Sequence, residues 1–94
     1  MMDSFFADVS VPARRRLYIY RDPPATDNVS VRGWCFVVDE MNANLEWIPL
    51  RDAWEETFSE IMLYPDLYSN EPIIWRESET GQLVSMADIS LRYI

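Results

Sequence analysis

Alternating apolar and polar residues predict β-strands in the first half of the chain. In residues 17–20, two aliphatic side chains fall on one face and two tyrosines on the other, as expected of a strand whose side chains alternate between faces. Residues 29–38 start with the same alternation and then become apolar on both faces, which predicts a strand inside a sheet. Residues 45–48 predict a third strand that ends at Pro49. The short connections favour an antiparallel meander.

Residues 52–64 carry the pattern of the main helix. Asp52 and Glu55 have the spacing of a capping box, and apolar residues then recur at steps of three and four. This spacing places Trp54 and Phe58 in the core. A proline follows directly and would end the helix, and residues 65–70 indicate one further helical turn.

The last third of the chain predicts a hairpin and one final element. Residues 73–76 and 82–84 are strand-like, and the loop between them contains Gly81. From Asp88 onward apolar and polar residues alternate strictly, which favours a final strand. A short helix capped by Ser85 is the alternative.

Together these elements predict one α+β domain spanning residues 1–94. Its small antiparallel sheet combines the three-strand meander with the C-terminal hairpin, and a single main helix, about residues 52–64, covers one face of that sheet. Residues 1–12 are expected to be extended or loose.

Charge adds a surface to this picture. The chain holds 16 acidic residues and eight basic ones, all of them arginine, for a formal net charge of −8. Residues 33–94 carry twelve of the acids and three of the arginines, a net of −9. Such a field repels nucleic acid and membranes and attracts basic proteins. We therefore expect no membrane contact and no direct nucleic-acid contact, and we expect the arginine run 14–16 to pair with carboxylates.

The missing residue types exclude most catalytic templates. Without histidine, serine and cysteine nucleophiles lack their usual base, and without lysine, Schiff-base chemistry and Walker-type phosphate binding are excluded. No cofactor and no metal site is predicted, because residues 39–46 lack the spacing of a calcium loop. Carboxylate pairs, Glu77 with Glu79 or Asp39 with Glu40, keep a hydrolase as a remote alternative.

The protein is expected to be located in the cytoplasm. Cys35 is the single cysteine and cannot form an internal disulfide. The start of the sequence is acidic, unlike a secretory signal, and no apolar stretch reaches the length of a membrane span.

The candidate binding surface is acidic and aromatic. On the predicted helix, Asp52, Glu56 and Glu60 lie four residues apart with Glu55 beside them. Like charges at this spacing cost about 0.2–0.5 kcal/mol per pair, so their retention suggests recognition of a cationic groove. A solvated face that only keeps the protein soluble gives the same pattern.

Four tryptophans and five tyrosines exceed the needs of a core this small, so some should reach the surface. The residues expected in an exposed aromatic patch are Tyr18, Tyr20, Tyr64, Tyr68 and Trp75. The predicted partner-binding residues are Asp52, Glu55, Glu56, Glu60, Tyr64, Tyr68 and Trp75.

By class, small acidic α+β proteins without catalytic residues are similar to inhibitors encoded by phages and mobile elements, anti-CRISPR proteins among them. Our leading hypothesis is a non-enzymatic inhibitor that binds a basic, nucleic-acid-handling protein. Mimicry of nucleic acid is one way in which such inhibitors bind. If the protein is phage-encoded, it would act in the cytoplasm of a bacterial host. The alternative is an accessory subunit or homodimeric structural protein that uses the aromatic patch. Salt dependence of binding separates the two.

Overall fold

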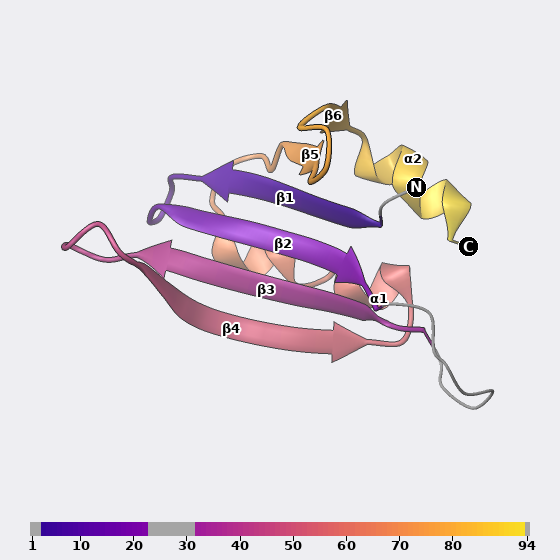
Figure 1. Ribbon diagram of the computed structural model, residues 1–94, viewed down its shortest axis with the longest axis horizontal. Coiled ribbons are helices and arrows are strands. Elements are labelled where there is room, and N and C mark those ends of the chain that lie inside the picture. Colours follow the sequence, from indigo (N-terminus) through magenta and orange to yellow (C-terminus); the bar gives the residue numbers. More distant parts are fainter. Residues whose placement is uncertain (1–2, 23–31, 94) are drawn as a thin grey trace.

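The computed structural model describes residues 3–22 and 32–93. In this part of the chain, six strands form one antiparallel sheet in the order β4-β3-β2-β1-β5-β6 (Figure 1). The strands are β1 (Ser4–Val9), β2 (Arg15–Arg21), β3 (Trp34–Met41), β4 (Trp47–Glu55), β5 (Trp75–Glu77) and β6 (Leu83–Val84). The α-helices are α1 (Phe58–Ile61) and α2 (Met86–Arg92), and the 3₁₀ helix η1 spans Pro65–Tyr68. The predicted α+β fold with an antiparallel sheet is confirmed.

The predicted meander and hairpin are both present, and β1 joins them. β1 pairs with β2 on one side and with β5 on the other. Phe5, Ala7 and Val9 are buried and alternate with more exposed residues, so part of the N-terminal stretch forms an interior strand of the sheet. Residues 29–31 of the predicted inner strand lie outside the described residues, and β3 begins at Trp34.

The predicted helix over residues 52–64 is wrong, because its first four residues belong to β4. β4 pairs with β3 along its length, with Ala53 opposite Phe36 and Trp54 opposite Cys35. Ala53 and Trp54 fit a helical spacing with the residues after them, but in the sheet they point to opposite faces. Trp54 is therefore half exposed instead of buried in the core, whereas Phe58 is buried as predicted.

Pro49 does not end its strand, also contrary to the prediction. β4 is the edge strand of the sheet, and the register shifts between Val38 and Asp39, directly beside Pro49. Proline lacks a backbone N–H and is tolerated at sheet edges and bulges, where no partner strand needs that donor.

The helix that does form starts at a threonine cap, Thr57. The Thr57 hydroxyl accepts a hydrogen bond from the Glu60 backbone N–H (3.2 Å), as an N-cap side chain does. The same hydroxyl donates to the Glu60 carboxylate (2.7 Å). α1 is only four residues long. The further helical turn predicted after it is confirmed as η1.

The favoured final strand is wrong and the alternative helix is right. Ser85 caps α2, and its hydroxyl accepts from the Asp88 backbone N–H. Ile89 is buried, and Met86 and Tyr93 pack against the core, which is the spacing of one helix face. Leu91, which strict alternation would have placed beside Ile89, is 69% exposed.

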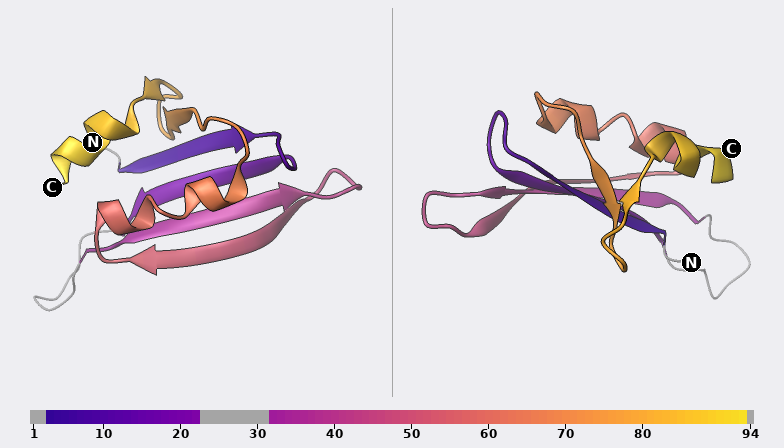
Figure 2. Two further views of the ribbon diagram at one scale, coloured as in Figure 1. Left: turned by 180° about the vertical axis from the view of Figure 1, so that it is seen from behind. Right: turned by 90° about the horizontal axis from the view of Figure 1, so that it is seen from above.

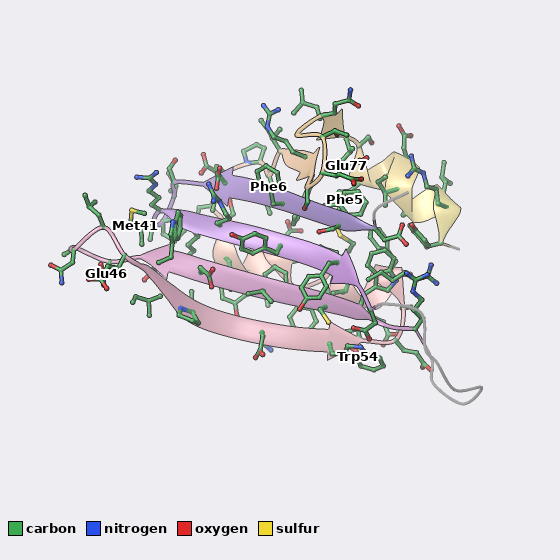
Figure 3. All side chains as sticks on the ribbon, in the orientation of Figure 1. Phe5, Phe6, Met41, Glu46, Trp54 and Glu77 are labelled. Atoms are coloured by element: carbon green, nitrogen blue, oxygen red, sulfur yellow. The ribbon has the colours of Figure 1, made fainter. Side chains whose placement is uncertain are left out.

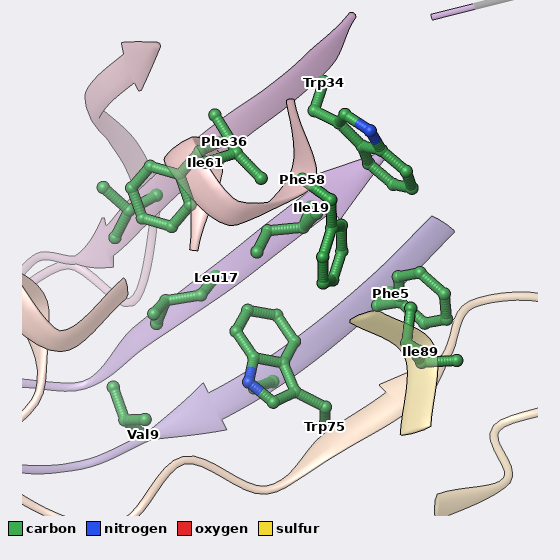
Figure 4. Packing of buried hydrophobic residues seen from close by; sticks show 12 residues of the cluster. Phe5, Val9, Leu17, Ile19, Trp34, Phe36, Phe58, Ile61, Trp75 and Ile89 are labelled. Carbon is green, nitrogen blue, oxygen red and sulfur yellow. The ribbon is translucent and has the colours of Figure 1, made fainter. Parts of the chain in front are cut away.

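The helices all lie on one side of the sheet (Figure 2). Between them and the sheet lies the core (Figure 4), which consists of Phe5, Ala7, Val9, Leu17, Ile19, Trp34, Phe36, Val38, Phe58, Ile61, Trp75 and Ile89. No described element covers the other side, which we call the open face. None of the described helices has the length and apolar character needed to cross a bilayer.

Candidate functional site

The four predicted acidic residues do not form a stripe, because the helix that would align them is absent. Asp52 and Glu55 both lie on β4, where Asp52 is opposite Val37 on the open face and Glu55 shares the core side. Glu56 follows the strand and Glu60 lies in α1. Among the described residues, no arginine forms an ion pair with any of the four.

The predicted aromatic patch divides between the core and the open face. Trp75 is only 5% exposed and belongs to the core, so its predicted exposure is wrong. Tyr64 and Tyr68 are half-buried, with ring centres 5.9 and 5.7 Å from that of Phe36. Tyr18 and Tyr20 lie on the open face, opposite Val37 and Cys35 in β3.

Three of the predicted residues meet in one hollow beside the β4 edge. Glu55, Glu60 and Tyr64 line it together with two exposed leucines, Leu63 and Leu67, and its volume is about 250 Å³. The Tyr64 hydroxyl donates to the Glu55 carboxylate (2.5 Å), and this hydrogen bond raises the pKa of Tyr64 above its usual value. The tyrosine is therefore neutral at physiological pH.

The largest set of solvent-facing aromatic side chains lies on the open face. The strand register places these residues there: Phe6, Tyr18, Tyr20, Cys35, Val37, Met41, Trp47 and Trp54. All of them are half-buried or exposed, and Tyr20 and Trp54 are 38% and 50% exposed. Figure 3 looks onto this face, with Phe6, Met41 and Trp54 on three different strands. Phe6, Trp47 and Trp54 were missed by sequence reasoning, although alternation with buried Phe5 and Ala7 marks Phe6 as outward-facing.

One arginine is already held on this face by aromatic rings and a carboxylate. The Arg16 guanidinium lies 5.2 Å from the Trp47 ring centre and 6.0 Å from that of Phe6. It also donates to Asp8 at 2.6 Å. Arg15 pairs with Glu40 at 2.9 Å. The expectation that the 14–16 run pairs with carboxylates, of its own domain or of a neighbour, is confirmed within the domain for Arg15 and Arg16.

At the other end of the open face, aromatic side chains line a second hollow of about 340 Å³, which we call the aromatic hollow. It is lined by Tyr20, Cys35, Val37, Asp52, Ala53 and Trp54. Asp22 lies beside it and accepts two hydrogen bonds, one from the Trp54 indole N–H (2.6 Å) and one from the Cys35 thiol (3.3 Å).

The thiol and the phenol in the wall of the aromatic hollow are both neutral at physiological pH. Partial burial raises the pKa of the Cys35 thiol, and the hydrogen bond to Asp22 raises it further. Burial likewise raises the pKa of Tyr20. The hollow therefore presents a thiol and a phenol, and its negative charge comes from Asp52.

The described residues contain no cluster of side chains that could hold a metal ion, and they do not bring Asp39 and Glu40 together as a carboxylate pair. No group of three or more cysteine, aspartate or glutamate side chains there is close enough to hold a metal ion. Asp39 and Glu40 are neighbours on β3 and point to opposite faces of the sheet, Glu40 toward Arg15.

The chain matches no protein-family model, no curated protein and no solved structure.

Proposed function

We propose that this protein is a non-enzymatic binding protein whose open face docks on a basic protein partner. The observation that carries the proposal is an aromatic sheet face that no described element covers. Sheets in small domains usually pack both hydrophobic faces or leave one polar. Exposed aromatic side chains that gather on one face are typical of interaction surfaces.

Charge supports a basic partner. The protein carries a net charge of −8, and Arg16 on the open face is already neutralised by Asp8. Asp39 and Asp52 share this face, and in the described residues neither forms an ion pair with an arginine. A complementary field speeds encounter with cationic proteins and disfavours nucleic acid as a direct ligand.

We further propose that the partner is a nucleic-acid-handling protein and that binding inhibits it. Surfaces that hold phosphates are rich in arginine and lysine, and these residues pair equally well with carboxylates. Surfaces that stack bases also accept aromatic side chains. An acidic face with exposed rings offers both kinds of contact.

The test is affinity capture on the immobilised full chain at low and high salt, with retained proteins identified by mass spectrometry. Three baits are compared: the wild type, the double variant Tyr18→Ala/Trp47→Ala, and Leu91→Ala, which removes an exposed side chain from α2. The proposal expects a basic protein retained at low salt by the wild type and by Leu91→Ala only. Its purified form should lose nucleic-acid binding when our protein is added. The proposal is contradicted if all three baits retain the partner equally, or if the wild type retains it equally at low and high salt.

The same open face supports the second candidate, an accessory or homodimeric structural protein. An aromatic face can bury itself against a second copy or a permanent subunit without any role for charge. The charge of −8 on each copy opposes self-association. Sedimentation velocity across a range of protein concentrations distinguishes the two, because a homodimer predicts a concentration-dependent mass that Trp47→Ala lowers.

A further inference from the structure

We infer that the aromatic hollow binds an arginine side chain, supplied by the basic partner. This inference rests on the proposed function and specifies its central contact. Tyr20 and Trp54 supply two aromatic rings, and Asp52 supplies a carboxylate. Aromatic rings attract cations within about 6 Å of their centres, and a carboxylate pairs with a guanidinium through two parallel hydrogen bonds.

The protein already uses this combination elsewhere on the same face. The Arg16 guanidinium lies within 6.0 Å of the ring centres of Phe6 and Trp47 and pairs with the carboxylate of Asp8. The aromatic hollow repeats that set of groups, two aromatic rings and one aspartate, but among the described residues no arginine lines it. The chain thus shows a filled version and an unfilled version of one recognition arrangement.

The walls of the hollow are held in place before any ligand arrives. The Trp54 indole N–H is fixed by Asp22, and the ring packs so closely on Gly33 that a Cβ there would lie 2.1 Å from it. Each carboxylate oxygen of Asp22 accepts one hydrogen bond, Oδ2 from the Trp54 indole and Oδ1 from the Cys35 thiol. The Asp52 carboxylate, by contrast, is exposed. A rigid ring and an available carboxylate reduce the ordering cost of binding.

Guanidinium fits this hollow better than other candidates. A second copy of the chain would bring the same net charge of −8 toward Asp52, and an uncharged apolar group would leave that carboxylate without a partner. An ammonium group can pair with Asp52, but it lacks the planar surface that stacks on an indole ring.

The experiment titrates acetyl-arginine methylamide into the isotopically labelled full chain and follows it by two-dimensional NMR. The matched neutral probe is acetyl-citrulline methylamide, which has nearly the same shape and no charge. We expect the arginine probe to shift the Trp54 indole N–H and the backbone amides of Cys35 and Val37, and the citrulline probe to leave them unchanged. Trp54→Leu assigns the indole signal.

Two aspartate variants locate the charge. Asp52→Asn should weaken binding of the arginine probe about tenfold, the effect of one charge-assisted hydrogen bond. Asp66→Asn is the control, because Asp66 is an exposed carboxylate in η1, outside the aromatic hollow, and it should bind like the wild type. Equal effects of the two variants would mean that the probe senses only overall charge, and would overturn the inference.

The outcome is separable from that of the proposed function. If the arginine probe leaves Trp54 unshifted while Tyr18→Ala/Trp47→Ala still abolishes partner capture, the inference fails and the open face stands as the docking surface. If the probe binds at the hollow but the open-face variant captures the same partner as the wild type, the hollow is a cation site and the proposed docking surface is wrong.

Discussion

Replacing Gly33 with alanine should displace Trp54 from the sheet and open the aromatic hollow. A Cβ at Gly33 would lie 2.1, 2.2 and 2.5 Å from three atoms of the Trp54 ring. Carbon atoms rest at about 3.5–4.0 Å, so the ring must move by about 1.5 Å or more. The clash is with the end of a half-exposed side chain, which can swing toward solvent, so the fold should survive.

The cost follows from what that movement breaks. The 2.6 Å hydrogen bond from the Trp54 indole to Asp22 is lost, at about 1.5 kcal/mol for a partly exposed charged acceptor. Since Trp54 is 50% exposed, roughly 125 Å² of its surface is covered, and uncovering a third of that costs about 1 kcal/mol. Alanine returns about 0.4–1 kcal/mol by restricting the unfolded chain. The net loss is about 1.5–2 kcal/mol.

Thermal and urea unfolding measure this loss, and a domain of this size should melt roughly 6–15 °C lower. The tryptophan emission should shift to the red, and the Trp54 indole N–H should lose its downfield position in the NMR spectrum. Ala53→Gly, at the neighbouring position on the opposite face of β4, is a control that weakens the strand without touching the ring. A Gly33→Ala protein that is more stable than the wild type, with its indole signal unmoved, would refute the reasoning.

Other positions give further predictions. Ile19→Ala, at a fully buried site, should cost about 2–5 kcal/mol in urea unfolding, and a loss below 1 kcal/mol would contradict the assigned core. Thr57→Ala removes the cap of α1 and should cost about 1 kcal/mol, whereas Thr80→Ala in the hairpin loop should cost less. Burial, and then a hydrogen bond to Asp3, raise the pKa of Tyr93 from 10.0 to about 12. Because the folded pKa lies above the unfolded one, this contribution to stability is complete below about pH 10 and is lost as the pH rises toward 12. Tyr93→Phe should lack that loss, which ultraviolet titration together with melting temperatures at alkaline pH can check.

The sequence predicted the elements whose periodicity is local and strong. Strands β2 and β3, the hairpin of β5 and β6, and η1 all carry clear alternation or punctuation by glycine and proline. The start of β4 was predicted as a strand, but its last four residues were predicted as a helix, because β4 is an edge strand exposed to solvent. Leu50, Arg51 and Asp52 are all exposed, so the two-residue period that identifies a strand is weak there, and its pairing with β3 is not visible from local spacing.

For the candidate site, the sequence predicted the exposure of single residues but not their arrangement. Asp52 and Tyr20 were expected at the surface and are exposed there, but Trp54 was assigned to the core by helical spacing. The aromatic hollow exists because the register of three strands puts Tyr20 and Trp54 on either side of Cys35. That register depends on contacts between residues distant in the sequence, which neither composition nor spacing reveals.

Because β1 lies in the interior of the sheet, it connects strands β2–β4 on one side to the β5–β6 hairpin on the other. β5 contacts the rest of the sheet through β1, so the last strands of the described chain pair with its first strand. Removing β1 would leave the three strands β2, β3 and β4 and a hairpin without its partner strand, and Leu17 and Ile19 would lose Ala7 and Phe5 as neighbours. Reporter tags and truncations aimed at mapping the partner are therefore safer when they spare both termini and alter single side chains of the open face.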